Sequence, residues 1–324
     1  MVSFASNDYL GLSAHPHVRV AAAEALARSG AGAGSSRLIV GSLRPHAELE
    51  EAIAEWTGAE AALVFASGYQ ANVGVIATLG AGALIVSDEL NHASIIDGAR
   101  LARSQVAVYR HGNLDQAADL LAGASGRALL VSDTVFSMDG DLADVASLSE
   151  ICGRTGALLV LDDAHAVFDR PAVPPSVSCV RVGTMSKTLG SQGGFAVGDR
   201  RWIDLLVNRA RSFIFSTGLA PSSAAAAQAA VEICRSPEGD RLRSVLRTHT
   251  DAIRIGHPAP IVPVVVGDEA AAVAASDHLL AAGLLVPAIR PPTVPPGTCR
   301  LRVSLSAAHH HDEVGRLAKV LAEL

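Results

Sequence analysis

Lys187 is one of only two lysines in the chain, whose other basic residues are all arginines. The second, Lys319, lies in a charged amphipathic stretch near the C-terminus, where a lysine is normally a solvated cation. Lys187 instead follows an apolar run that begins at Val180, and its neighbours are Thr, Ser and Gly residues. An amine at a strand end that opens onto a site can have its pKa lowered and can form a Schiff base with an aldehyde. Lys187 is therefore the candidate for covalent amine catalysis, with a solvated loop lysine as the plainer alternative.

Three more polar groups follow apolar runs and could complete a site around such an amine. They are Gly68 and Tyr69 after residues 60–65, His92 after 83–86, and Asp162 and His165 after 157–161. Backbone donors at a helix start can hold a phosphate, an imidazole can cover a flat ring, and a carboxylate can pair with a ring nitrogen. With an amine, these groups supply what pyridoxal phosphate requires. Each group alone is equally typical of a turn or a capped helix start, so only their combination indicates a cofactor site.

The elements that must position these groups alternate between strand and helix patterns. Strand-like apolar runs occupy 60–65, 83–86, 106–109, 127–132, 157–161 and 193–198, and another ends near Thr184. Helical periodicity separates them, over about 68–79, 94–103, 114–122, 146–154, 201–211 and 221–234. This spacing predicts right-handed crossovers and a mostly parallel sheet with helices on both faces. Ligands in such sheets bind at the carboxyl ends of the strands, where these polar groups lie.

We therefore expect an α/β fold with a large domain built on a mostly parallel sheet and a smaller C-terminal α/β domain. Residues 1–40 are expected to form an N-terminal segment that contributes to the small domain and the site, 41–235 the large cofactor-binding domain, and 236–324 the small domain. Helices are predicted over 15–27 and 45–57. In the small domain, strands are predicted over 261–266 and 299–305 and helices over 240–250, 270–282 and 311–324, with a proline-rich loop at 289–298.

Composition excludes several other classes of protein. Apolar residues make up 49% of the 324 residues and charged residues 18%, which is typical of a folded domain with a substantial core. The net charge of −6 shows no long run of one sign, so nucleic-acid binding is not expected. The four cysteines are widely spaced, and no signal peptide or apolar run of about 18 residues is present. These features predict reduced thiols, no membrane span and a cytoplasmic protein.

Two other motifs are weaker candidates for ligand binding. The glycine- and serine-rich run at 30–36 lacks a following GK[ST] and does not join a strand to a helix, which argues against a phosphate loop. The three consecutive histidines at 309–311 precede a predicted helix start, and adjacent side chains point in different directions. No metal site is therefore expected.

Several longer motifs occur in a fixed order along the chain. They are SNDYLGLS, SGYQAN, NHAS, VFSMDGD, LDDAH, TMSK, FSTGLAP and AIRPPTVPPGTCRLR. With these motifs the chain resembles, from Ser6 to the C-terminus, the α-oxoamine synthases, a family of fold-type I pyridoxal-phosphate enzymes. The last motif is similar to the substrate-facing segment of the branch of this family that makes 8-amino-7-oxononanoate.

The resemblance implies a role at the cofactor for each matching residue. Lys187 would bind the cofactor aldehyde and later act as the base at the substrate Cα. Asp162 would pair with the pyridine nitrogen, and His92 would stack on the ring. His165 would hydrogen-bond the phenolic oxygen, with Ser137 close by. The phosphate would be held by backbone groups of Gly68 and Tyr69, by Thr184 and Ser186, and by Thr217 from the neighbouring subunit of a homodimer.

The resemblance also implies substrates and a reaction. Arg302 would bind the amino acid carboxylate, and Asn7 and Thr293 would line the substrate pocket. The reaction would be the decarboxylative condensation of L-alanine with a pimeloyl thioester, which releases CO2 and either CoA or acyl carrier protein. Relatives such as glycine acetyltransferase and serine palmitoyltransferase, which use glycine or serine, are alternatives. So is a cofactor-binding protein with impaired turnover.

The chain departs from the family pattern in two places. Family members usually carry a helical segment before SNDYLGL, and its absence here predicts either a start downstream of the native one or an incomplete acyl pocket. The glycine-rich sequence that usually follows DDAHG is replaced by the shorter, proline-rich segment 166–175. This segment is expected to border the site and the subunit contact, and therefore to affect acyl preference and turnover more than cofactor binding.

Overall fold

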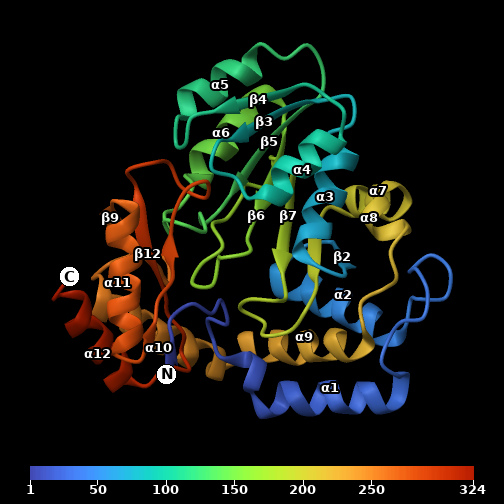
Figure 1. Cartoon of the computed structure of the whole chain (residues 1–324). Helices are drawn as coiled ribbons and strands as arrows, with labels where there is room; N and C mark the ends of the chain where they lie inside the picture. Colours follow the sequence, from blue (N-terminus) through green and yellow to red (C-terminus); the bar gives the residue numbers. More distant parts are fainter.

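A seven-stranded sheet forms the centre of the larger part of the molecule in the computed structural model, which describes all residues 1–324 (Figure 1). The strands are β2 (Ala61–Phe65), β3 (Leu84–Asp88), β4 (Val106–Tyr109), β5 (Ala128–Asp133), β6 (Leu158–Asp162), β7 (Cys179–Thr184) and β8 (Gly194–Gly198). They are arranged in the order β2-β8-β7-β6-β5-β3-β4, and only β8 runs against its neighbours. The predicted mostly parallel sheet is therefore confirmed, and the carboxyl ends of β3, β5, β6 and β7 lie at one edge.

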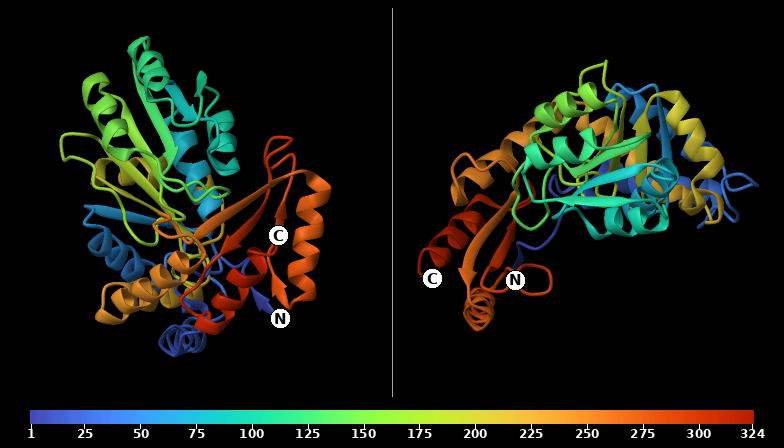
Figure 2. Two further views of the ribbon diagram at one scale, coloured as in Figure 1. Left: turned by 90° about the vertical axis from the view of Figure 1, so that its left-hand side faces the viewer. Right: turned by 90° about the horizontal axis from the view of Figure 1, so that it is seen from above.

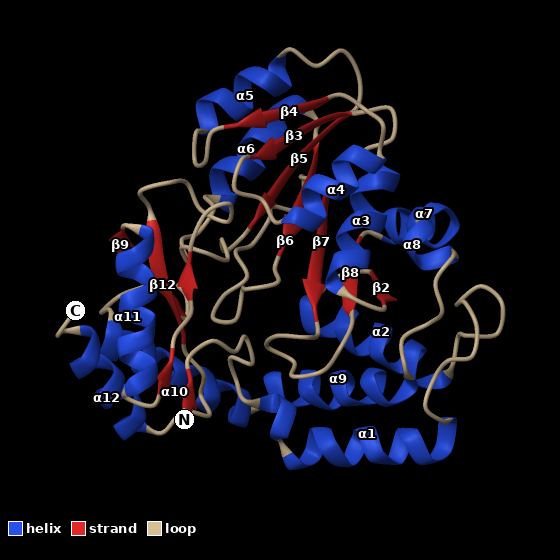
Figure 3. Ribbon diagram, viewed as in Figure 1, coloured by secondary structure: helices blue, strands red, loops and turns tan.

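Helices cover both faces of this sheet (Figure 3). Buried side chains alternate along each strand, so that Val160 packs in the cluster of α3, α4 and α7 while Leu159 and Leu161 pack in the cluster of α5 and α6. One face carries α3 (Gly68–Leu79), α4 (Ala93–Leu101) and α7 (Arg200–Arg209); the other carries α2 (Arg44–Thr57), α5 (Leu114–Ala122), α6 (Val145–Thr155) and α9 (Pro221–Cys234). The long helix α1 (Pro16–Ser29) lies along α9 (Figure 1).

A second, smaller sheet lies in the C-terminal part of the chain. It is antiparallel, with the order β11 (Ala288–Ile289), β12 (Cys299–Ser304), β9 (Ile261–Gly267), and it is accompanied by α10 (Pro237–Ile253), α11 (Glu269–Ala281) and α12 (His311–Leu321). The first strand of the chain, β1 (Val2–Ser3), pairs in parallel with β10 (Leu284–Leu285). The N-terminus therefore lies beside this C-terminal part (Figure 2). Residues 4–9 continue along it, because the Ala307 N–H donates to the Tyr9 carbonyl over 2.8 Å.

The structure differs from the sequence expectations at a few element boundaries. The helix predicted over 201–211 is divided into α7 and the short α8 (Arg211–Ile214), because Ala210 between them is extended and fully buried. The last helix ends at Leu321 instead of 324. The strands β1, β10 and β11 contain two residues each and were not predicted, since two residues carry no periodicity.

The structure of the whole chain also bears on membranes, metals and thiols. None of its helices combines the length and the apolar character needed to span a bilayer. No three His, Cys, Asp or Glu side chains converge as metal ligands would. All four cysteines are free.

Candidate active site

A cavity of about 270 Å³ lies at the carboxyl edge of the large sheet, beside the start of α3. Its lining includes nine of the residues that the sequence predicts for a site: Gly68, Tyr69, His92, Ser137, Asp162, His165, Thr184, Ser186 and Lys187. Strand alternation explains why the polar groups converge. Asp133, Asp162 and Thr184 end neighbouring strands and point to the same face as the buried residues two positions earlier, which pack against α3.

One end of the cavity is suited to a phosphate. The Ser67 side chain caps α3 by accepting from the Gln70 N–H over 3.1 Å, and the first amides of the helix, at Gly68 and Tyr69, have no partner within it. Thr184 Oγ1 and Ser186 Oγ lie 2.7 Å apart on the facing turn. Amides of a helix start and clustered hydroxyls are the donors that a phosphate group requires.

The other end carries the carboxylate of Asp162, which is held by two donors. Asn72 Nδ2 donates to Asp162 Oδ2 over 2.5 Å, and the Ala164 N–H donates to Oδ1 over 2.8 Å. Asn72 Nδ2 also donates to Ser94 Oγ over 2.9 Å, and Ser94 Oγ lies 2.7 Å from His92 Nδ1. A fixed chain of hydrogen bonds therefore joins the predicted partner of the ring nitrogen to the predicted ring-stacking histidine.

These hydrogen bonds also set the tautomer of His92. The Ser94 N–H donates to His92 Nδ1 over 3.2 Å, and a backbone amide can only donate, so Nδ1 is an acceptor. Burial lowers the pKa of His92, which favours the neutral ring. The proton of the imidazole therefore resides on Nε2.

Asp133 is a second buried carboxyl in the cavity, in register with Asp162 on the neighbouring strand. Its Oδ2 accepts the backbone N–H of His92 over 2.9 Å. Burial, and then the negative charge of Asp162, raise the pKa of Asp133 well above its usual value. Asp133 is therefore suited to hold the His92 backbone in place rather than to add a second charge.

Lys187 begins a hydrogen-bonded chain that reaches the C-terminal sheet. Lys187 Nζ lies 2.9 Å from His165 Nε2, and His165 Nδ1 lies 2.6 Å from the Tyr9 hydroxyl. Tyr9 donates to Asn7 Oδ1 over 3.1 Å, and Arg302 Nη2 donates to the same oxygen over 3.2 Å. Every group is satisfied if Lys187 donates to Nε2 and the His165 Nδ1–H donates to Tyr9.

Burial controls the protonation of the side chains in this series of hydrogen bonds. It is the main cause that lowers the pKa of Lys187, although the charge of Asp162 opposes the effect. Burial, and then the charge of Lys187, lower the pKa of His165 well below its usual value. Burial also raises the pKa of Tyr9, which keeps its hydroxyl protonated. The site therefore favours a neutral amine beside a neutral imidazole.

The predicted substrate-binding residues lie at different distances from the cavity. Arg302 is buried in β12, and its Nε donates to the carbonyl of Ser137, a lining residue, over 2.6 Å. Asn7 joins the site through Tyr9 and Arg302. Thr293 is exposed in the loop before β12, and Thr217 is exposed beside Ser36. The structure does not bring Thr293 or Thr217 to the cavity of the same chain.

Four residues that complete these networks were not singled out from the sequence: Tyr9, Asn72, Ser94 and Asp133. The first three lie inside the motifs SNDYLGLS, SGYQAN and NHAS. Asp133 ends a strand two positions before the start of VFSMDGD at Val135. Their position in or beside these motifs is the sequence feature from which they could have been identified.

The residues of the cavity fit the predicted cofactor on the chemistry of their donors and acceptors. A carboxylate stands at one end, hydroxyls and helix amides at the other, and an amine and an imidazole pair lie between them. Pyridoxal phosphate offers a ring nitrogen, a phosphate, an aldehyde and a phenolic oxygen as the complementary groups.

Comparison with known proteins agrees with this geometry. The family model for aminotransferase class I and II matches residues 1–321. The 8-amino-7-oxononanoate synthase of Anaeromyxobacter dehalogenans is 46% identical over 100% of this chain and 86% of its own length, and that of Methylorubrum extorquens is 47% identical over the same shares.

Solved structures share the fold. Serine palmitoyltransferase from S. paucimobilis with bound PLP-myriocin aldimine superposes with a TM-score of 0.94 at 28% identity, over 99% of this chain and 86% of the other. The 8-amino-7-oxononanoate synthase from Francisella tularensis superposes with a TM-score of 0.81 at 22% identity, over 100% of this chain and 97% of the other. The predicted fold-type I architecture is thereby confirmed. From the family model and the full-length relatives, the chain belongs to the class I and II aminotransferase family and, within it, to the 8-amino-7-oxononanoate synthases.

Proposed function

We propose that the chain catalyses the decarboxylative condensation of L-alanine with a pimeloyl thioester, giving 8-amino-7-oxononanoate, CO2 and either CoA or acyl carrier protein. The observation that carries this proposal is the partly buried Lys187 amine beside His165, in a cavity with Asp162 at one end and a phosphate-binding turn at the other. Alanine is favoured over serine because identity is 43–48% to eight oxononanoate synthases and 28–31% to two serine palmitoyltransferases of known structure.

The cofactor is pyridoxal 5′-phosphate. When bound, it supplies an electron-accepting ring that stabilises negative charge at the Cα of the amino acid. Asp162 would hold the ring nitrogen, His92 would cover the ring, and the amides of Gly68 and Tyr69 with Thr184 and Ser186 would hold the phosphate. The chain of hydrogen bonds through Asn72 and Ser94 supports the first two roles, because it fixes both side chains before anything binds.

The remaining steps depend on groups of the chain that bind the substrate or move protons. Arg302 would hold the alanine carboxylate, for which its planar guanidinium is suited, and would release it when CO2 leaves. Lys187 would take the Cα proton, which its lowered pKa allows because the neutral amine is present at lower pH than in a free lysine. His165 accepts a hydrogen bond from Lys187 in the structure and would keep the amine directed into the cavity.

We further propose that two copies of the chain share their sites. Leu38, Ile39 and Val40 are exposed, as is Phe215 at 69%, and the Ser36–Thr217 bridge brings these two segments together. Exposed apolar side chains in one place are typical of a protein interface. In such a homodimer Thr217 would reach the phosphate in the partner's site, and Thr293 would border the acyl substrate.

The domain limits and the cellular location are also proposals. The large sheet lies within 61–198 and the small one within 261–304, which supports division after residues 40 and 235. A CoA or carrier-protein thioester as substrate supports action in the cytoplasm.

The proposal is tested with cofactor-loaded protein, pimeloyl-CoA or pimeloyl-acyl carrier protein, and L-alanine, glycine or L-serine in separate reactions. We expect 8-amino-7-oxononanoate by mass spectrometry with alanine only. Lys187→Ala should keep its circular dichroism spectrum and lose both product and the visible absorption band of the lysine-bound cofactor. Turnover of serine or glycine in place of alanine would favour one of the related synthases, and a cofactor band without any product would indicate impaired turnover.

A further inference from the structure

A second cavity, of about 330 Å³, lies on the opposite face of the sheet from the cofactor site. We call it the rear cavity and define it by Trp56, Asp163, Phe168, Arg170, Thr188 and Arg243. Its position follows from strand alternation, because Asp162 and Asp163 are consecutive and therefore point to opposite faces. Asp162 lines the cofactor cavity and Asp163 lines the rear cavity.

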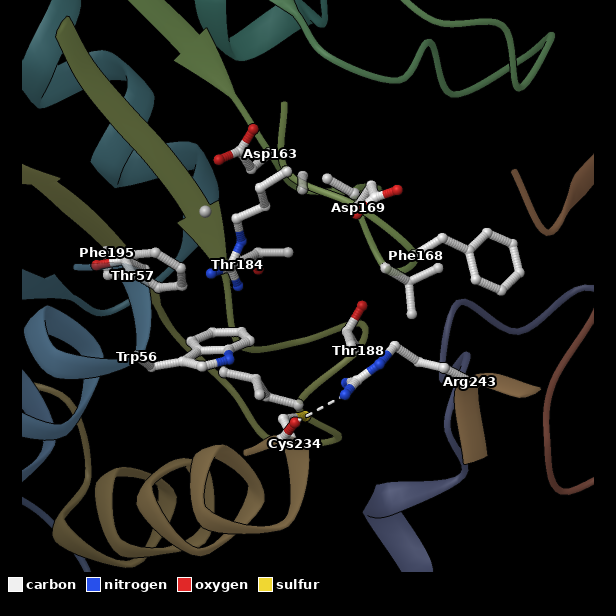
Figure 4. A pocket seen from close by; sticks show the side chains of 16 residues that line it. Trp56, Thr57, Asp163, Phe168, Asp169, Thr184, Thr188, Phe195, Cys234 and Arg243 are labelled. Atoms are coloured by element: carbon white, nitrogen blue, oxygen red, sulfur yellow. Dashed lines mark hydrogen bonds between the residues drawn. The ribbon is translucent and has the colours of Figure 1, made fainter. Parts of the chain in front are cut away.

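The walls of the rear cavity come from parts of the chain that are far apart in sequence. Figure 4 shows Trp56, from the end of α2, and Arg243, from α10, on opposite sides, with Thr188 between them. Phe168 and Arg170 belong to the segment after β6, where the chain departs from the family pattern. One wall of the rear cavity is therefore particular to this chain.

The rear cavity contains a cation that the protein leaves unpaired. The Arg170 guanidinium lies 3.6 Å from the centre of the Trp56 ring, but it makes no hydrogen bond to the protein and no carboxylate lies within 4 Å of it. Asp163, the nearest candidate, is already paired with Arg181, whose Nε lies 3.1 Å from Asp163 Oδ2. Arg170 is partly buried, and a guanidinium that has lost part of its hydration is stabilised when an anion or acceptor meets it.

Two further groups extend the binding capacity of the rear cavity. Arg243 donates through Nη2 to the Cys234 carbonyl over 3.1 Å and is paired through the same nitrogen with Asp240 at 2.5 Å, which leaves its other N–H groups for the space that Figure 4 shows. Asp163 Oδ1 is buried and has no hydrogen-bond partner. An anion that also carries a hydroxyl or amino group would satisfy both the cations and this acceptor.

We propose that the rear cavity binds a small carboxylate or phosphate anion, with Arg170 as its main partner and Arg243 as the second. Stacking on Trp56 holds the Arg170 guanidinium by its face and leaves its edge N–H groups for two parallel hydrogen bonds to such an anion. The two cavities share Ala164, Gly183 and Thr184 in their linings, but Arg170 and Arg243 line only the rear cavity and Lys187 and His165 line only the cofactor cavity. The anion site does not depend on the proposed reaction.

The chain offers a direct optical test, because Trp56 and Trp202 are its only two tryptophans. In a Trp202→Phe background, Trp56 is the only indole and reports on the rear cavity. The protein is loaded with cofactor, so that its own phosphate site is filled, and titrated at constant ionic strength with sodium phosphate or sodium malonate. We expect a saturable change in Trp56 fluorescence with at least one of the two, and the anion that produces it tells phosphate from carboxylate.

Variants in the same background decide whether Arg170 is responsible. Arg170→Gln should weaken binding and raise the half-saturating anion concentration at least tenfold. Arg243→Gln should raise this concentration by a smaller factor. Arg201→Gln is the matched control, because Arg201 is an exposed arginine that lies over the other indole, and it should leave the titration unchanged. The proposal is wrong if neither anion gives a saturable change, or if Arg170→Gln binds as tightly as its parent. Should Arg170→Gln not fold, Arg243→Gln alone must still weaken binding.

Discussion

The hydroxyl of Tyr9 connects the predicted catalytic lysine to the predicted carboxylate-binding arginine. His165 lies on one side of it at 2.6 Å and Asn7 on the other at 3.1 Å, and Arg302 donates to the same Asn7 oxygen. Because all these groups are at least partly buried, water cannot easily replace a missing partner. One oxygen therefore helps to fix the position of both Lys187 and Arg302.

Removing this hydroxyl should impair catalysis more than folding. In Tyr9→Phe the His165 Nδ1–H loses its buried acceptor, which typically costs about 1–3 kcal/mol. We expect kcat/KM for L-alanine to fall by about 5- to 150-fold, which is the same energy expressed as a rate ratio. Tyr69→Phe is the control, since its hydroxyl meets only Asp97 at the surface. A native kcat/KM in Tyr9→Phe would show that the hydrogen-bonded chain is not needed.

At this scale the sequence predicts residues that belong to recognisable motifs and misses their long-range partners. Lys187, Asp162 and His92 could be named because each follows an apolar run. Tyr9 could not be placed beside His165, because 156 residues separate them and only the fold brings them together. The role of Asp133 likewise depends on its register with Asp162 on the adjacent strand.

Among the elements, the turn at 135–142 connects the two sheets. It is closed by a bridge between Val135 and Leu142, and it reaches β12 through the Asp139–Arg300 ion pair. Toward the large sheet it is held by His111, whose ring nitrogens lie 3.0 Å from Asp88 Oδ1 and 2.7 Å from Asp141 Oδ2. Since the Ser137 carbonyl in this turn accepts from Arg302, the turn helps to position the arginine that is predicted to bind substrate.

The imidazole between two carboxylates should make stability depend on pH. Burial opposes a charge on His111, but the hydrogen bonds to Asp141 and Asp88 outweigh it and raise the pKa. A raised folded-state pKa gives stability that is complete below the unfolded value of about 6.5 and is lost as pH rises through the folded value.

We therefore expect His111→Gln to lower the free energy of unfolding by about 1–2 kcal/mol at pH 6 and by clearly less at pH 9. Gln retains an amide donor, so the comparison isolates the charge. Chemical denaturation of both proteins at the two pH values measures the difference. An equal loss at both values would mean that the charge of His111 contributes nothing.

The close approach of β8 and α3 provides a second prediction about elements. A Cβ at Gly194 would lie 2.5 Å from the Cα of Gly68, so that the start of α3 would have to move. Overpacking of this kind costs about 1–3 kcal/mol, and here it acts on the predicted phosphate-binding amides. Gly194→Ala should weaken cofactor binding about tenfold or more in an absorption titration. Gly315→Ala, where a Cβ meets open space, is the control, and equal affinity of the two variants would contradict this account.

Most elements could be predicted from periodicity alone, and β4, α5 and α9 have the expected limits. The break between α7 and α8 could not be predicted, because both sides are helical and the extended residue between them, Ala210, is an alanine, a good helix former. The β1–β10 pairing could not be predicted either, because it joins residues 2–3 to residues 284–285.

For the molecule as a whole, the proposed sharing of sites can be tested by mixing variants. Lys187→Ala removes the amine of its own site, whereas Thr217→Glu would place a carboxylate against the phosphate in the partner's site. Each variant alone should be inactive. Co-expressed, they should recover about a quarter of native activity, since half of randomly assorted dimers are mixed and each has one intact site.

No recovery from the mixture, with dimers present by light scattering, would place Thr217 within the site of its own chain, and native activity of Thr217→Glu on its own would place Thr217 outside any site. Thr217→Ser is a suitable control, because it retains the hydroxyl and should remain active on its own. The fold of one chain shows that segments 36–40 and 215–217 lie at the surface. Whether they contribute to the site of their own chain or to that of the partner depends on the dimer.

The contrast between the two lysines has a practical use. Lys187 is partly buried and has a lowered pKa, whereas Lys319 is on the exposed face of α12. Once the cofactor occupies Lys187, ordinary amine-reactive reagents can reach only Lys319 and the terminal amine. The enzyme can therefore be attached to a bead, a dye or a sensor surface through nearly uniform chemistry, with its reactive centre left free.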